Sequence, residues 1–261
     1  MKKISFLAAL IMLVLLCSCA GNDSPEKDKI PPTTPKLIPH LGDTGDDPIT
    51  IDGALVNLND DNNGIDAVSD GNWIKVPWEK FVDNDLSHVK VFRYTESNPE
   101  PNLIATVPAA DNYYLDQSSL VERQWYYYYV ELYDASGNFS VSDTVSYAIL
   151  AKSILTSPAD GEYVDPTELS LCWERGDSQT NKFKVLLWDN DTGNLVFDYD
   201  YYYTPNVEPS PPPEFPFPVL TPAPVNGQVY RWRIDAFDLD SEHNLEMGSE
   251  SLERTLIIHY N

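Results

Sequence analysis

The chain has 261 residues, of which 42% are hydrophobic and 12% aromatic, so it is long enough to bury more than one apolar core. Its 41 acidic residues outnumber the 17 basic ones, and the formal net charge is −24. Such a surface repels phosphate groups, and we therefore expect no nucleic-acid partner. Of the three cysteines, two lie at positions 17 and 19, so the folded part is expected to have no internal disulfide.

The N-terminal residues have the pattern of an export signal. Lys2 and Lys3 precede an apolar run, residues 4–16, that is too short to span a bilayer comfortably. The next residues, Leu16-Cys17-Ser18-Cys19-Ala20, resemble the lipobox of bacterial lipoproteins. The resemblance implies a signal peptide at 1–18 and lipidation of Cys19, so that the mature chain is anchored to a membrane through its N-terminal lipid. An ordinary secretory signal cleaved nearby is the alternative.

The residue after the lipidated cysteine gives an expectation of location. Ala20 stands where an Asp would, by the enterobacterial sorting rule, imply retention in the inner membrane. The resemblance therefore implies an outer-membrane lipoprotein of the bacterial cell envelope, either periplasmic or surface-exposed. Residues 19–36 are rich in Gly, Asn, Asp, Ser, Pro, Glu and Lys with hardly an apolar side chain, which predicts a flexible tether.

Beyond the tether the hydrophobic pattern has a period of two, and no segment has a sustained helical period, so we predict an all-β protein. Turn-forming residues bound the runs. The predicted strands lie near 49–56, 72–79, 87–94, 102–107, 113–118, 125–133 and 139–149 in the first half, and near 153–156, 168–174, 182–189, 194–202, 214–220, 228–238 and 247–258 in the second. This spacing is typical of antiparallel sandwiches.

The two halves repeat one plan. Trp78-Glu79 in the first half corresponds to Trp173-Glu174 in the second, and the alternating run 126–134 corresponds to 230–238, each ending in an aromatic residue and Asp. On these residues the chain resembles tandem fibronectin type III domains. The resemblance implies two tandem immunoglobulin-like β-sandwiches, domain 1 at 37–150 and domain 2 at 151–261, with tyrosine corners at Tyr126 and Tyr230.

The alternation along 125–133 predicts an exposed aromatic surface. If Tyr126 and Tyr128 point inward, the intervening residues point outward, and the neighbouring strand does the same. The candidate ligand-binding residues are Phe92, Tyr94, Trp125, Tyr127, Tyr129 and Tyr133. Such rings suit a glycan or a protein partner. Alternatively, the rings pair across strands or pack against the second domain.

An acidic segment, residues 59–70, is similar to a calcium-binding loop. Asn59, Asp61, Asn63 and Asp70 stand at positions 1, 3, 5 and 12, with a glycine at position 6. The loop departs from the pattern, because Asn replaces Asp at position 1 and Asp replaces the usual bidentate Glu at position 12. A solvated acidic loop is the alternative. Apart from this calcium ion, no cofactor is expected.

No catalytic motif or triad spacing is present in the sequence, so we do not expect an enzyme. Cys172 is expected to be an inert residue, and the proline-rich stretch 205–224 to be a stiff extended loop. The predicted function is an extracytoplasmic binding or adhesion lipoprotein that recognises a glycan, or an envelope or extracellular protein, through its exposed aromatic strands. The alternative is a structural spacer or assembly subunit of a cell-envelope complex with no diffusible ligand.

Overall fold

Alternating side chains fold the chain into strands, as the computed structural model shows. The structure describes residues 28–38, 49–51, 54–56, 65–68, 71–204, 211–240 and 245–260. The prediction of an all-β fold is confirmed for these residues. Within them, no helix is long and apolar enough to cross a membrane. The strands β1 (Ile49–Ile51) and β2 (Ala54–Val56) form a hairpin where one continuous strand is predicted.

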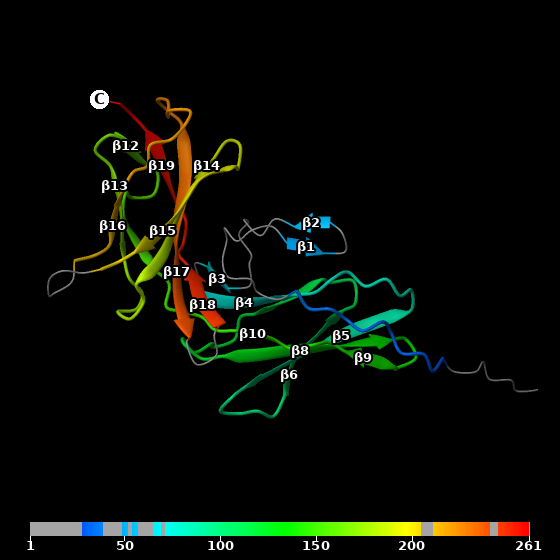
Figure 1. Cartoon of the computed structure of the whole chain (residues 1–261). Coiled ribbons are helices and arrows are strands. Elements are labelled where there is room, and N and C mark those ends of the chain that lie inside the picture. The colour runs from blue at the N-terminus through cyan, green and yellow to red at the C-terminus, as the bar shows by residue number, and fades with distance from the viewer. Residues whose placement is uncertain are drawn as a thin grey trace, which may run out of the picture. The chain divides into compact units, whose positions relative to one another are not determined.

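The first sandwich comprises strands β3 to β10. Their bounds are β3 (Ile65–Val68), β4 (Gly71–Pro77), β5 (Leu86–Thr95), β6 (Asn102–Pro108), β7 (Tyr113–Asp116), β8 (Tyr126–Asp134), β9 (Phe139–Val141) and β10 (Val145–Tyr147). A three-stranded sheet, β3-β4-β7, faces a five-stranded sheet, β10-β8-β5-β6 with β9 also paired to β8 (Figure 1). Side chains of both sheets share one apolar cluster, which includes Ile74, Trp78, Val91 and Val130.

The second sandwich comprises strands β11 to β19. Their bounds are β11 (Ile154–Ser157), β12 (Glu162–Val164), β13 (Ser170–Glu174), β14 (Lys182–Asp189), β15 (Leu195–Tyr202), β16 (Glu214–Pro216), β17 (Val229–Asp240), β18 (Leu245–Glu250) and β19 (Arg254–Ile258). One sheet has the order β11-β13-β16, and the other has the order β12-β19-β17-β14-β15 with β18 paired to β17. Trp173, Val185 and Trp232 lie in the apolar cluster between them.

The two sandwiches repeat one strand order, as the sequence predicts. In each, the middle strand of the small sheet (β4 or β13) is followed by two strands of the large sheet, then by one strand of the small sheet, then by the central strand of the large sheet (β8 or β17). Trp78 and Trp173 occupy equivalent buried places. The Val121 N–H donates to the hydroxyl of Tyr126 at 2.7 Å, which is the contact of a tyrosine corner.

Several predicted strand boundaries are wrong. The predicted strand 139–149 divides into β9 and β10, and 247–258 divides into β18 and β19 because Ser251 bulges: its backbone N–H donates to Ile234, while its Oγ accepts from the Ile234 N–H. The predicted strand 214–220 is only the short β16. The strands β3 and β12 are not predicted, because runs of four and three residues are too short for the alternation to show.

The predicted tether is wrong in its last residues, because these residues pack on the first sandwich. Ser140 donates to the Pro32 carbonyl, the Thr33 N–H donates to Asp83, and Leu37 forms a β-bridge with Trp78. Lys36 also pairs with Glu79 at 3.2 Å. Prolines in this segment lock φ, so the segment loses little further entropy when its carbonyl groups and side chains find partners.

The connection between the sandwiches is hydrogen-bonded along its length. The Leu150 N–H donates to the Gly248 carbonyl at 2.9 Å, and the Gly248 N–H donates to Ala148 at 3.3 Å, so the linker adds a parallel bridge beside β18. A Cβ atom on Gly176 would lie 2.3 Å from the Ala151 carbonyl oxygen. Glycine is therefore required where the loop after β13 crosses the linker.

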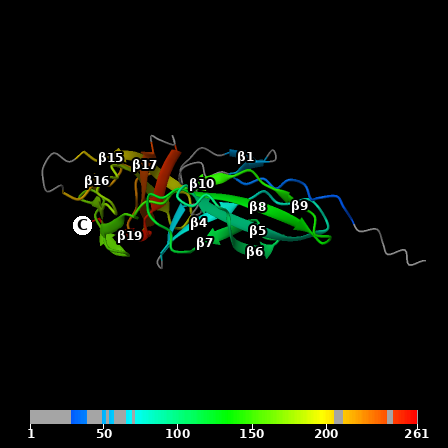
Figure 2. The same ribbon diagram turned by 90° about the horizontal axis from the view of Figure 1, so that it is seen from below.

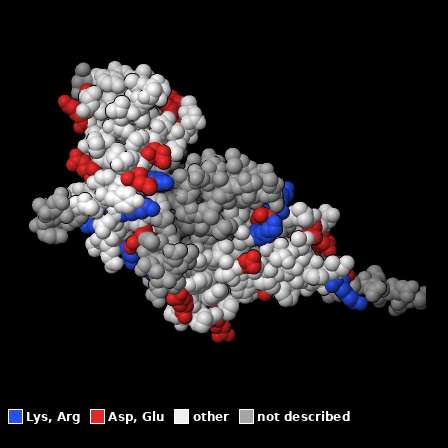
Figure 3. All heavy atoms as spheres, viewed as in Figure 1, with Lys and Arg blue, Asp and Glu red and all other residues white. Residues whose placement is uncertain are grey.

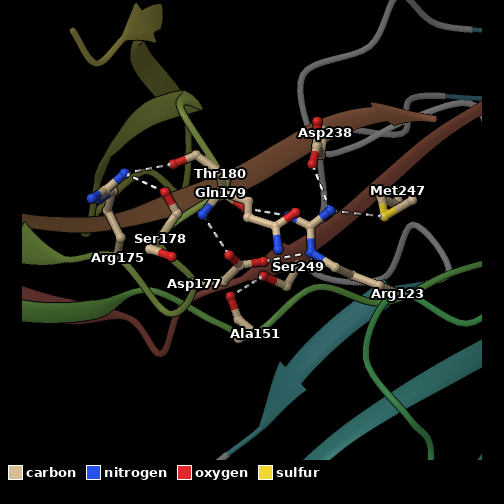
Figure 4. Close-up of polar contacts among 10 residues, drawn as sticks. All are labelled: Arg123, Ala151, Arg175, Asp177, Ser178, Gln179, Thr180, Asp238, Met247 and Ser249. Carbon is tan, nitrogen blue, oxygen red and sulfur yellow. Dashed lines mark hydrogen bonds and ion pairs between the residues drawn. The ribbon is translucent and has the colours of Figure 1, made fainter. Parts of the chain in front are cut away.

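An arginine from the first sandwich clamps this junction. Arg123 lies just before β8 with φ of 60°, and its guanidinium donates at 2.6 Å to both Asp177 and Asp238 of the second sandwich (Figure 4). The same side chain reaches Thr180 at 3.3 Å and the Met247 sulfur at 3.9 Å. Charge-assisted bonds at both ends of one planar group thus join the turn before β8 to the loop after β13 and to β17.

A second charged cluster is buried on β17. Arg233 is 2% exposed and pairs at 2.9 Å with Asp235, which is 0% exposed, and at 2.8 Å with Glu250, which is 3% exposed. Glu253 lies 3.9 Å away and also pairs with Arg231 at 3.1 Å. Both guanidinium groups lie 5.2 Å from the ring of Trp188. Each buried charge thus has a charged partner, as the cost of desolvation requires.

The turn between β11 and β12 gives an acid-sensitive contact. Asp160 accepts bonds from the Thr255 N–H at 2.7 Å and from the Thr255 hydroxyl at 2.8 Å, and these bonds hold the pKa of Asp160 below its ordinary value of 3.8. A lowered pKa stabilises the fold above the ordinary value, and this stabilisation is lost as the pH falls through the folded pKa.

We therefore expect Asp160→Asn to lower the free energy of unfolding at pH 7 and to have little effect at a pH well below 3.8. Urea unfolding of both chains at the two pH values measures the difference. An equal difference at both pH values would show that the carboxylate charge has no role.

Candidate functional site

One outer sheet surface collects most of the aromatic residues singled out by the sequence. It is defined here as the aromatic face and consists of outward side chains of β5, β8 and β9: His88, Phe92, Tyr94, Tyr127, Tyr129, Tyr133 and Phe139. β5 lies between β8 and β6, and Figure 2 shows β8, β5 and β6 side by side. Five of the six predicted binding residues belong to this face.

Strict alternation along β8 creates the face. Tyr126, Tyr128, Val130 and Leu132 are all buried in the core, and the residues between them are half-buried on the other side of the sheet. The Tyr128 hydroxyl donates to the buried Asp116 at 2.8 Å. Burial and this neighbouring carboxylate raise the pKa of Tyr128 above its ordinary range. The predicted inward and outward sets on β8 are therefore confirmed from Tyr126 to Tyr133.

The outward rings form stacked pairs across the two strands. Phe92 lies opposite Tyr129, with ring centroids 4.9 Å apart and planes 3° apart. Tyr94 stacks on Tyr127 at 5.1 Å and 14°. The register of β5 with β8 places these rings directly opposite one another, the arrangement in which cross-strand pairs stabilise a sheet.

A third stack extends the face to β9. The His88 and Tyr133 rings are 4.7 Å apart with planes 7° apart, and Tyr133 stacks on Phe139 at 5.1 Å. His88 and Phe139 are absent from the predicted site. The register that places His88 opposite Tyr133 could be read only with the strand pairing known. Phe139 could have been predicted from the sequence, because it is the first aromatic residue after the turn at Asp134.

Polar groups accompany the rings. The Tyr127 hydroxyl donates to Glu96 at 2.9 Å, and the Tyr133 hydroxyl donates to Glu131 at 2.8 Å. Lys90 lies on β5 between His88 and Phe92, and its Nζ atom is 4.3 Å from the Tyr133 ring centroid. Burial raises the pKa of Tyr129, as do the nearby Glu131 and Tyr94. Tyr129 therefore stays neutral and protonated at physiological pH.

Exposed aliphatic side chains flank the stacked rings. Leu103 on β6 lies opposite Phe92 in register and is 46% exposed, and Val141 on β9 lies opposite Glu131 and is 44% exposed. Phe139 is 47% exposed. Together they widen the apolar surface beyond the two central strands.

Trp125 was predicted to point outward with the other rings, and this prediction is wrong. Its side chain is 6% exposed and belongs to the apolar cluster of the second sandwich. Trp125 precedes β8, so the alternation of the strand does not govern it. Tyr127 also packs against that cluster, which agrees with the alternative that some of these aromatics pack against the second domain.

Two predicted sites cannot be compared with the structure. The lipidation site Cys19 and the calcium ligands Asn59, Asp61, Asn63 and Asp70 lie outside the described residues. Inside the calcium loop, residues Ile65–Val68 form β3.

Cys172 is a free cysteine among the described residues, and its half-buried thiol lies on β13. Burial raises the pKa of this thiol, and so does the carboxylate of Glu214 opposite it in register. A raised pKa leaves little thiolate at neutral pH, which is the opposite of what a nucleophile needs. Cys172 is therefore poorly suited to catalysis.

Comparison with known proteins finds fold-level likeness only. No family model matches the chain, and no curated protein matches it. Among solved structures, the chain is similar to the FN1-FN3 domains of chicken CNTN1, with 12% identity, a TM-score of 0.31, and coverage of 88% of this chain and 68% of that one. For a two-domain fibronectin type III segment of chicken tenascin the values are 9%, 0.25, 70% and 89%. For pectate lyase Pel3 from Pectobacterium carotovorum they are 17%, 0.26, 39% and 30%. At these TM-scores the likenesses carry no functional weight.

Proposed function

We propose that the chain is a lipoprotein of the bacterial cell envelope, anchored through Cys19, that binds an extracytoplasmic glycan or protein through the aromatic face. The observation that carries the proposal is the row of stacked rings on β5 and β8, flanked by the exposed Leu103, Phe139 and Val141. Large aromatic side chains held rigidly by their neighbours lose little entropy on binding, which makes them effective binding anchors. The proposal assigns no catalytic step and no cofactor.

We expect replacement of Tyr127 and Tyr129 by alanine to abolish capture of the ligand. Removal of Tyr129 takes away the stacking partner of Phe92, and removal of Tyr127 takes away that of Tyr94. Each of the two stacked pairs therefore loses one ring. Capture of envelope extracts on immobilised chain, followed by elution and quantification, measures the effect.

Tyr127 also packs on the second sandwich, so Tyr129→Ala alone is the cleaner variant. Tyr199→Ala, which removes a 49% exposed ring from β15, is the matched control and should capture normally. Unchanged capture by the double variant would refute a role for the face.

The location can be tested on intact cells by protease shaving and immunoblotting, with a periplasmic protein as the control. Loss of the chain while the control survives would support adhesion or capture at the cell surface. Protection until the outer membrane is opened would support a periplasmic function. Mass spectrometry of the purified N-terminus tests lipidation of Cys19 directly.

A structural spacer or envelope-assembly subunit is the second candidate. The clamped junction favours it, because Arg123 and the linker bridge to β18 connect the two sandwiches by ion pairs and hydrogen bonds. A spacer should co-purify with fixed envelope proteins and should bind no soluble glycan or protein. Co-purification that is lost in Tyr129→Ala would instead assign the interaction to the aromatic face.

A further inference from the structure

The stacked rings present their edges to solvent. In the pairs Phe92–Tyr129 and Tyr94–Tyr127, the ring planes are 3° and 14° apart. Each ring therefore covers one flat face of its partner. Such rings stand upright on the sheet. Tyr133 has His88 and Phe139 stacked against it as well. Sugar rings bind aromatic residues through exposed ring faces, and the central rows offer few of them.

Ring edges carry partial positive charge, and they pack well against the faces of other aromatic rings and against aliphatic groups. A protein surface supplies both. Leu103, Phe139 and Val141, each more than 40% exposed, add aliphatic and aromatic contact area around the upright rings. The shape and chemistry of the face therefore match an apolar protein patch better than a carbohydrate chain.

The carboxylates of the face are paired with its tyrosines. The Tyr127 hydroxyl donates to Glu96 and the Tyr133 hydroxyl donates to Glu131, while the Tyr133 oxygen accepts from Lys90 at 3.2 Å. The preference for a basic partner therefore comes from the charge of the chain as a whole. The chain has a net charge of −24, and Figure 3 shows acidic side chains scattered over both sandwiches on the surface that it draws. Arginine and lysine side chains around an apolar patch complement this charge.

Resting on the proposed function, we infer that the partner of the aromatic face is a protein surface with an aromatic and aliphatic centre and a basic rim. Long-range attraction to the acidic chain accelerates its approach, and the upright rings fix its position. Binding weakens as ionic strength rises, because exposed charges are screened.

Defined probes test this inference on the purified full-length chain. Fluorescein-labelled 12-residue peptides of alternating Arg and Trp, or of alternating Glu and Trp, are titrated by fluorescence anisotropy, and chitohexaose and maltohexaose are titrated by calorimetry. We expect the Arg-Trp peptide to bind at least tenfold more tightly than the other probes. We expect its affinity to fall at least tenfold in Phe92→Ala/Tyr129→Ala, which removes one stacked pair, and to be unchanged in the control Tyr199→Ala.

A charge variant keeps the test informative if the double variant does not fold. Glu96→Lys changes an exposed residue, and it should weaken the Arg-Trp peptide several-fold without altering the thermal melt. Oligosaccharide binding that is lost in Phe92→Ala/Tyr129→Ala would overturn the inference but keep the proposed function. Equal binding of the two peptides would overturn the charge complementarity. If every probe binds and none of these variants changes its affinity, both the inference and the proposed function would be overturned.

Discussion

Arg233→Met should lower the free energy of unfolding by about 3–5 kcal/mol. The substitution leaves Asp235 and Glu250 buried without the guanidinium that lies 2.9 Å and 2.8 Å from them. Two carboxylates that face each other in register across β17 and β18 would then repel one another in a poorly solvated place. Domains of this kind are stable by only about 5–15 kcal/mol, so the loss is a large share of the total.

Urea unfolding followed by circular dichroism measures the effect. The matched control is Lys36→Met, which breaks an ion pair whose lysine side chain is 66% exposed and should cost at most about 1 kcal/mol. Adding Glu250→Gln to Arg233→Met should recover part of the loss, because one uncompensated charge disappears. A cost for Arg233→Met no greater than that of the control would contradict a buried charge cluster.

Gly176→Ala should have the second large effect. A Cβ atom at this position would lie 2.3 Å from the Ala151 oxygen and 2.5 Å from the Ala151 carbonyl carbon and the Lys152 oxygen, and all three are backbone atoms. The linker or the loop must move, which we expect to cost about 1–3 kcal/mol. Because the adjacent linker residues bond to β18, we also expect faster hydrogen exchange at the Leu150 and Gly248 amides.

Gly137→Ala is the matched control for this variant. Gly137 has φ of 85°, and a Cβ there would meet nothing within 4 Å, so the substitution adds backbone strain without a clash. It should leave exchange at Leu150 and Gly248 unchanged. Equal exchange at these two amides in Gly176→Ala and in the unaltered chain would show that the junction tolerates the methyl group.

The strands were predictable where side chains alternate over seven or more residues, as in β5, β8 and β17. Short strands were not, because three or four residues such as Glu162–Val164 are defined by their partner and not by a periodic pattern. The aromatic surface was predictable from parity alone. The stacking was not, since it depends on the register between β5 and β8.

Trp125 shows where parity fails. The alternation rule applies only inside a strand, and Trp125 lies one residue before β8 begins, where the chain turns it into the neighbouring sandwich. Arg123 was also missed, because its partners Asp177 and Asp238 are distant in sequence and a single arginine before a strand carries no signal. The packing of residues 32–37 was hidden by a composition typical of a linker.

The docking of residues 32–37 has a mechanical consequence. For a chain held at Cys19, as we propose, a pull from a partner on the aromatic face enters at β5 and β8 and leaves through this segment, which is fastened to the first sandwich at Trp78, Asp83 and Ser140. The tension therefore crosses the first sandwich alone. The second sandwich lies outside the load path, and its own stability would not limit how long a loaded attachment lasts.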